Sequence, residues 1–108
     1  LYGGGGDDTL NGGAGTDTYI GGAGTDLFII KANEGGSSIS DADVITDFTD
    51  GIDLIGMSGL EFTQLTREEG TGDYDNHVVV KITGTGEFLV IIQNISLSSI
   101  SNTDFLAI

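Results

Sequence analysis

The N-terminal part of the chain alternates between polar, glycine-rich stretches and single large apolar residues at a fixed interval. Leu10, Tyr19 and Phe28 recur at the same position of successive nonapeptides, and each lies two positions after an aspartate. The stretches that lead up to them are rich in Gly, which adopts left-handed backbone conformations readily and so favours tight turns. The pattern predicts a short strand around each apolar residue, with that side chain pointing inward.

Three nonapeptides follow one another without a gap, over residues 3–11, 12–20 and 21–29. Each has the form G-G-x-G-x-D-x-U-x, in which U is a large apolar residue. Leu1 has the U position of a preceding repeat, so we expect the chain to begin inside a longer array. Two nonapeptides make one full coil, so equivalent positions two repeats apart stack at a strand spacing of about 4.8 Å.

This stacking indicates a metal site. Asp8 and Asp26 have equivalent positions in the first and third repeats and would flank a gap lined by the backbone carbonyls of two Gly turns. Calcium takes six to eight oxygen ligands at about 2.3–2.6 Å, whereas magnesium prefers a smaller octahedron. A flexible linker is the alternative, but a linker has no reason to place Asp once in every nonapeptide. Because each coil buries only two U side chains, we expect calcium to supply much of the folding free energy.

The repeats resemble the RTX (repeats-in-toxin) family, whose nonapeptides build calcium-bound parallel β-rolls. Residues 43–55, with D-x-I-x-D-F followed by G-x-D-x-I, look like the segment after the last repeats of serralysin-type proteases and alginate epimerase R-modules. The end, Asp104–Ile108, is similar to the C-terminus of type I secretion substrates. The resemblance implies a secreted, extracellular, all-β protein: one domain, with a short parallel β-roll at 1–30 and a β-rich capping and secretion region at 31–108.

The resemblance also implies the calcium ligands. In RTX rolls one turn gives two carbonyls and its Asp, and the stacked turn gives the same. For the first site these are Gly4, Gly6 and Asp8 with Gly21, Ala23 and Asp26. On the opposite edge Gly13, Gly15 and Asp17 would begin a second site. Its missing carboxylate is expected from Asp43, with Asp41 and Asp47 as competitors. A weaker third site would use Gly22, Gly24 and Asp26.

The second half of the chain has a different pattern. Strands are expected at Val44–Phe48, Ile52–Ile55, Val78–Ile82, Phe88–Ile92 and Phe105–Ile108. The segment Thr83-Gly84-Thr85-Gly86 predicts a hairpin between two of them. Residues 60–66 alternate, residues 67–76 are polar and are expected to form a loop, and residues 96–102 to hold a short turn. This half should supply most of the apolar core and cover the open end of the roll.

The composition excludes several classes of function. Asp and Glu number 17 against three Lys and Arg, which gives a net charge of −14. A nucleic-acid binder needs a basic patch, and anionic lipid would repel such a chain. The chain has no Cys, so it has no disulfide, thiolate zinc site or thiol nucleophile. No apolar run approaches the roughly 20 residues of a membrane span.

The sequence also lacks catalytic motifs. It contains neither H-E-x-x-H nor G-x-S-x-G, and its single histidine, His77, is expected to lie on the surface. We therefore expect no catalysis in this chain, although the protein that carries it can be an enzyme. The main hypothesis is a calcium-binding module that folds after type I secretion. The alternatives are a calcium-dependent module for an extracellular polysaccharide such as alginate, with only Lys31, Arg67 and Lys81 as cations, and the terminal segment of a calcium-rigidified adhesin.

Overall fold

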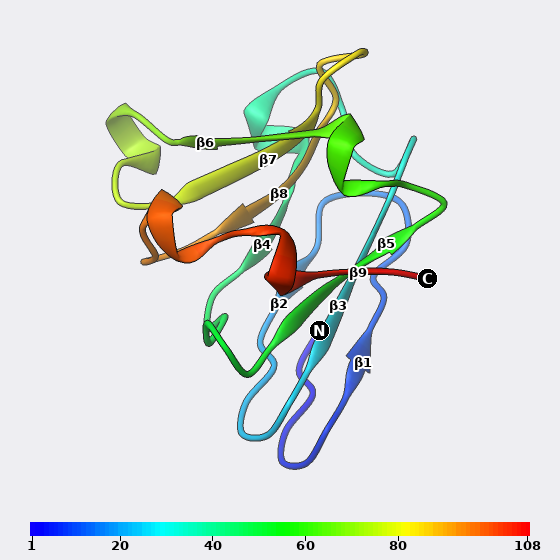
Figure 1. Ribbon diagram of the computed structural model, residues 1–108, viewed down its shortest axis with the longest axis vertical. Coiled ribbons are helices and arrows are strands. Elements are labelled where there is room, and N and C mark those ends of the chain that lie inside the picture. Colours follow the sequence, from blue (N-terminus) through cyan, green and yellow to red (C-terminus); the bar gives the residue numbers. More distant parts are fainter.

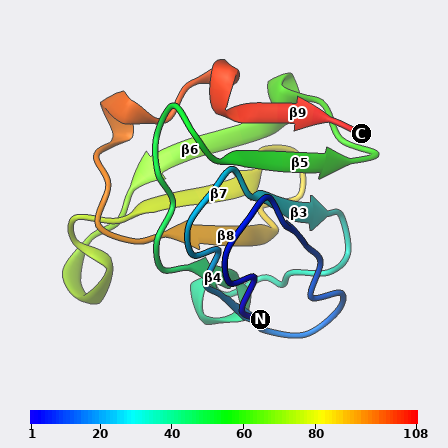
Figure 2. The same cartoon turned by 90° about the horizontal axis from the view of Figure 1, so that it is seen from below.

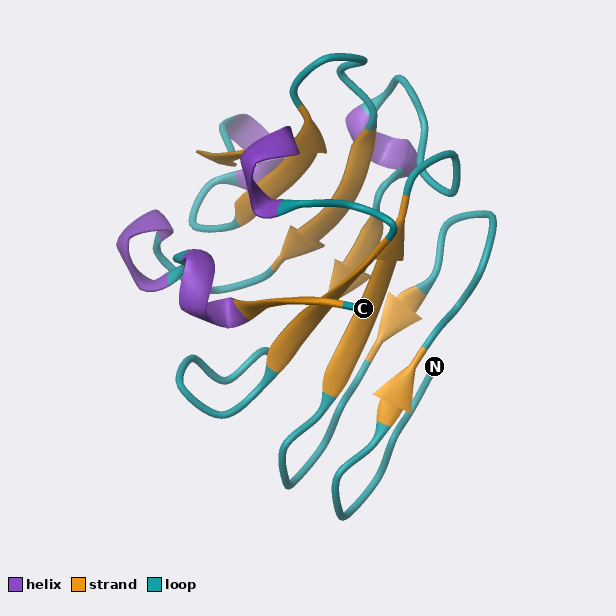
Figure 3. Cartoon of the chain, turned by 45° about the vertical axis from the view of Figure 1, so that its right-hand side comes forward, coloured by secondary structure: helices purple, strands orange, loops and turns teal.

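The computed structural model describes all 108 residues and is built almost entirely of β-strands (Figure 1). The nine strands are β1 (Thr9–Leu10), β2 (Thr18–Tyr19), β3 (Leu27–Lys31), β4 (Asp43–Ile45), β5 (Leu54–Ser58), β6 (Leu65–Glu69), β7 (Val78–Ile82), β8 (Phe88–Ile92) and β9 (Phe105–Ala107). Five short 3-10 helices join them: η1 (Ile39–Asp41), η2 (Phe62–Gln64), η3 (Gly72–Tyr74), η4 (Leu97–Ser99) and η5 (Asn102–Asp104). Figure 3 shows these helices at the ends of strands. None of them is long and apolar enough to cross a membrane.

Successive strands of the repeat region fall in different sheets. One sheet has the order β1-β3-β5-β9 and the other has the order β2-β4-β8-β7-β6. The chain therefore winds between two sheets, and each of β1 to β5 pairs in parallel with a strand of the next coil, from β1 with β3 to β5 with β9. Figure 2 shows β3, β5 and β9 following one another across one sheet. The expected all-β fold with a parallel β-roll is confirmed.

The strand register confirms the coil of two nonapeptides inside the repeats. Thr9 pairs with Leu27 and Leu10 with Phe28, which are equivalent positions of the first and third repeats. Beyond the repeats the coils are longer, because Tyr19 pairs with Ile45 and Phe28 pairs with Ile55. The connections that lengthen these coils lie outside the strands, so the inward-facing column of side chains is preserved.

One apolar core runs through both halves of the chain. The U residues of all three repeats, Leu10, Tyr19 and Phe28, are buried in a cluster of 17 residues. The rings of Tyr19 and Phe28 meet edge to face, with centroids 5.9 Å apart. The same cluster holds much of β7 and β8, including Val80 and Ile92. The few apolar side chains of the repeat coils are therefore buried against the side chains of the second half.

The second half continues the roll. β8 pairs in parallel with β4, β9 pairs in parallel with β5, and only β6 and β7 add an antiparallel extension. The hairpin at 83–86 forms as predicted between β7 and β8. The predicted loop at 67–76 is wrong for residues 67–69, which belong to β6. These charged residues form an edge strand because the aliphatic strand β7 pairs with them along its full length.

Candidate metal centre

The glycine-rich turns owe their shape to alternating backbone conformations. The glycines at the second and fourth positions of each repeat have positive φ, between 74° and 93°. The first and third positions do not. This difference explains why the third position accepts a side chain, as in Ala14 and Ala23, while the second and fourth are Gly in every repeat.

Equivalent turns of the first and third repeats stack closely, with carbonyl oxygens directed across the gap. A Cβ atom built on Gly22 would clash with the carbonyl oxygen of Gly4, and one built on Gly24 would clash with that of Gly6. Figure 1 shows the turns of the first and third repeats together at the bottom of the view, while the turn of the second repeat lies at the opposite edge. The gap is therefore lined by backbone oxygens, and only glycine fits at these positions.

The aspartates of stacked turns form two ladders of hydrogen bonds. On the first edge the Asp8 amide donates to Asp26 Oδ1, and the Asp26 amide donates to Asp53 Oδ1, both at 3.0 Å. On the second edge the Asp17 amide donates to Asp43 Oδ1 at 2.8 Å. One oxygen of each acceptor carboxylate thus holds the register between coils, and the other remains for a further contact.

In each of the three repeats, one carboxylate oxygen of the aspartate has no hydrogen-bond partner. Asp8 Oδ2, Asp17 Oδ2 and Asp26 Oδ2 are each shielded from solvent and unpaired, and the whole Asp26 side chain is 0% exposed. A buried charged oxygen without a partner is strongly unfavourable, so nearly all such atoms in native proteins are satisfied by a donor or an ion. Three of them at the same position of three repeats indicate a cation site.

Burial and mutual repulsion disfavour charge on two carboxylates of the ladders, those of Asp26 and Asp43. Burial, reinforced by the charges of Asp53 and Asp8, raises the pKa of Asp26. Burial, reinforced by Asp17, also raises the pKa of Asp43, to about 6. No basic side chain offsets this charge, because the single salt bridge of the structure joins Lys81 to Glu68. Arg67 donates to the Ile100 carbonyl and lies over the Phe62 ring.

Comparison with known families agrees with this geometry. Residues 1–28 match the family model of the RTX calcium-binding nonapeptide repeat, in four copies. These residues are RTX repeats. The match covers the turns that carry all three unpaired Asp oxygens, and calcium binding is the property that defines the repeat. No curated protein matches the chain in sequence.

The first edge of the RTX repeats fits calcium well. The residues expected to bind are Gly4, Gly6 and Asp8 on one turn and Gly21, Ala23 and Asp26 on the other. Of these, Asp8 and Asp26 each bring an unpaired buried oxygen. No group of three His, Cys, Asp or Glu side chains forms a metal site by itself. An ion here would therefore depend on backbone carbonyls for most of its ligands, as calcium does readily.

On the second edge the structure separates the three candidate carboxylates. Asp43 lies against Asp17 through the ladder hydrogen bond. Asp41 instead accepts a hydrogen bond from the Ser38 amide in its own turn. Asp47 binds the third repeat, where its two oxygens accept the amides of Gly21 and Gly22 at 2.9 and 2.8 Å. The ligand role of Gly13, Gly15, Asp17 and Asp43 stays a prediction, with Asp43 in the expected place.

The third predicted site, at Gly22, Gly24 and Asp26, faces a gap that protein groups already bridge. Asp53 there accepts the Asp26 amide with one oxygen and the Thr49 amide with the other. Together with the Asp47 carboxylate on the Gly21–Gly22 amides, these bonds join the last repeat to the following turn. This site also stays a prediction, and its surroundings differ from those of the first site on the same edge in being rich in hydrogen bonds.

The sequence did not predict three side chains that lie at or near the candidate metal sites. Asp53 and Glu34 were not among the candidates, although Glu34 Oε2 lies 3.7 Å from where a Cβ on Gly13 would be. The pattern predicts Tyr19 only as an inward-facing apolar residue and gives no role to its hydroxyl. A signal for Asp53 does exist, because Asp53-Leu54-Ile55 repeats the D-x-U spacing of the nonapeptides outside their glycine context. Glu34 has no such signal, since it follows the repeats in an irregular segment.

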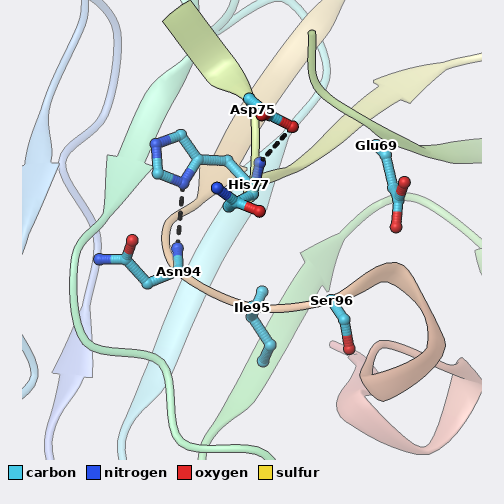
Figure 4. Close-up of a pocket in the computed structure, with 7 residues that line it drawn as sticks. Glu69, Asp75, His77, Asn94, Ile95 and Ser96 are labelled. Atoms are coloured by element: carbon cyan, nitrogen blue, oxygen red, sulfur yellow. Dashed lines mark hydrogen bonds between the residues drawn. The ribbon is translucent and has the colours of Figure 1, made fainter.

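The single cavity of the structure lies away from the RTX turns. It has a volume of about 440 Å³ and is lined by Glu69, Asp75, Asn76, His77, Asn94, Ile95 and Ser96 (Figure 4). His77 Nδ1 accepts a hydrogen bond from the Asn94 amide at 3.0 Å. All of the lining residues except Ile95 are polar, and two of them are acidic, so the cavity suits neither an apolar nor an anionic ligand.

Proposed function

We propose that this chain is a non-catalytic, calcium-binding RTX module of a secreted protein, and that calcium drives its folding after type I secretion. The observation that carries the proposal is the set of unpaired, buried oxygens on Asp8, Asp17 and Asp26. Calcium between stacked turns would satisfy these oxygens and neutralise part of the ladder. The ion would then stabilise the folded state alone, because the unfolded chain has no assembled site.

The net charge of the chain supports the same function. At low calcium the net charge of −14 repels itself in any compact state, which favours an extended chain. Outside the cell, calcium would reduce the repulsion and provide the unpaired oxygens with a partner. The chain would remain unfolded where it is made and fold where it is delivered.

The test is a calcium titration of the chelated chain followed by far-ultraviolet circular dichroism, with magnesium as the ionic control. We expect a cooperative gain of β signal with calcium alone. Asp26→Asn should shift the transition to higher calcium, because it removes a buried ligand oxygen. Asp73→Asn is the matched control, since it makes the same chemical change on an exposed residue of the η3 turn. A chain that is fully folded without calcium and indifferent to it would contradict the proposal.

A further inference from the structure

One side chain at an apolar position of the repeats carries a polar group into the core. Tyr19 is 1% exposed, and its ring packs like those of the other U residues. Its hydroxyl has two partners. It accepts a hydrogen bond from the Gly12 amide at 2.9 Å and donates one to Asp43 Oδ2 at 3.3 Å. The hydroxyl thus joins the start of the second turn to the carboxylate of the turn stacked on it.

The neighbouring repeats show what this position requires. Gly12 is the first glycine of the second repeat, and Gly21 is its counterpart in the third. The Gly21 amide donates to Asp47 Oδ1, so a carboxylate from a later coil satisfies it. In the third repeat the U residue is Phe28, which has no hydroxyl, and a Cβ on Gly21 would lie 2.9 Å from Phe28 Cζ. The Tyr19 hydroxyl therefore does in the second repeat what Asp47 does in the third.

The same bond fixes the orientation of Asp43. One oxygen of Asp43 accepts the Asp17 amide, and the other accepts the Tyr19 hydroxyl. With both oxygens held, the carboxylate is fixed beside Asp17, whose Oδ2 is buried and unpaired. Hydrogen bonds to ligand carboxylates orient them for a metal, and their loss commonly weakens metal binding by about 10- to 100-fold. Chained hydrogen bonds in a buried site also reinforce one another.

We infer that Tyr19 is a positioning residue for calcium on the second edge, where its hydroxyl holds the Gly12 turn and the Asp43 carboxylate in register around the ion. The inference rests on the proposed calcium binding and gives a polar role to a residue at an apolar position of the repeat motif. Under this inference the two edges differ in how their turns are held, because no tyrosine hydroxyl joins the stacked turns of the first edge.

Calorimetric titration of the full chain with calcium tests the inference. Tyr19→Phe keeps the ring and removes only the hydroxyl. We expect it to weaken one class of sites by roughly tenfold or more and to leave the other class unchanged. Tyr2→Phe is the matched control, since Tyr2 is 72% exposed. In an Asp17→Asn background, which disables the second edge, Tyr19→Phe should have no further effect on calcium affinity.

The outcomes separate the two proposals. No calcium uptake by the unmodified chain would overturn both the proposed function and the inference. Uptake by the unmodified chain, with Tyr19→Phe equal to Tyr2→Phe, would overturn the inference alone. So would tighter binding in Tyr19→Phe, which would mean that the hydroxyl competes with the ion, or an undiminished effect in the Asp17→Asn background.

A second measurement serves if Tyr19→Phe does not fold at saturating calcium. The chain has three tyrosines, so Tyr2→Phe with Tyr74→Phe leaves Tyr19 alone. An ion beside Asp43 should shift the ultraviolet absorption band of Tyr19, because its hydroxyl bonds to that carboxylate. Asp17→Asn should remove the part of the shift that accompanies second-edge binding. A Tyr19 band that responds identically with and without Asp17 would overturn the inference.

Discussion

At the scale of single residues, Asp26 does two things with one carboxylate. In Asp26, one oxygen accepts an amide from the stacked turn, and the other is buried without a partner. The first contact sets the register, and the second makes the metal-free fold costly. The carboxylates at the ends of the ladders, Asp43 and Asp53, have both oxygens satisfied by protein donors. The unfavourable burial of unpaired carboxylate oxygens therefore falls on the repeats themselves.

This arrangement predicts that acid partly replaces calcium. Burial raises the pKa of Asp43 from 3.8 to about 6, and it raises the pKa of Asp26 as well. A carboxyl group with a raised pKa in the folded state destabilises that state when ionised, so stability is lost as the pH rises from about 4 through 6. For Asp43 the penalty at neutral pH is at most about 3 kcal/mol, and solvent screening reduces it. The chelated chain should gain folded signal in circular dichroism as the pH falls from neutral to about 4.5.

Asp43→Asn is the control for this pH dependence. It removes one titrating carboxyl and keeps the side chain nearly the same size. The variant should be more folded than the unmodified chain at neutral pH without calcium, and its gain on acidification should be smaller. Equal gains in both chains would show that general charge repulsion, and not Asp43, governs the effect.

At the scale of elements, the nonapeptide period predicted how the strands of the repeats stack, but it did not predict the length of the coils that follow them. The coil of two nonapeptides could be read from Leu10 and Phe28, because the regular spacing fixes which strands stack. The hairpin between β7 and β8 followed from aliphatic runs around a Gly-Thr turn. The longer coils that bring β4 onto β2 and β5 onto β3 could not be derived, since their length depends on how the irregular connections fold. The charged end of β6 was missed because pairing with β7, not its own residues, makes it a strand.

The last strand illustrates how a short tail can matter to the whole sheet. β9 pairs in parallel with β5, and Phe105 is buried with its ring centroid 5.0 Å from that of Phe62. Phe105→Ala should lower the free energy of unfolding at saturating calcium by about 3–5 kcal/mol, the usual cost of emptying a buried aromatic site. Urea denaturation measures this loss. Leu106→Ala, on the exposed face of the same strand, should change stability by about 0.5 kcal/mol or less.

At the scale of the whole molecule, the two halves depend on each other. The repeats bring the acidic turns, and the second half brings most of the core that buries their U side chains. The proposed secretion signal, Asp104–Ile108, contains β9 and so belongs to the folded sheet. A signal that becomes a strand is available to an export channel only before folding, the state that low calcium would favour under the proposed function.

This overlap predicts a specific export phenotype. Deletion of Asp104–Ile108 from the protein that carries this chain should reduce the secreted fraction, measured by immunoblot of medium and cells at matched expression. Ile55→Ala is the control, because it empties a fully buried site of β5 and leaves every residue of the tail unchanged, and its export should be retained. Secretion that is unchanged by the deletion would contradict a role for the tail.

The winding of the chain between two sheets also fixes how the molecule responds to force. β1 and β9 are the two edge strands of one sheet, which has the order β1-β3-β5-β9. Force applied between these two strands would act on edge strands, which can peel from the sheet one at a time. Ions bound between coils would resist that peeling, so the force needed to unfold the roll would depend on the calcium concentration around it.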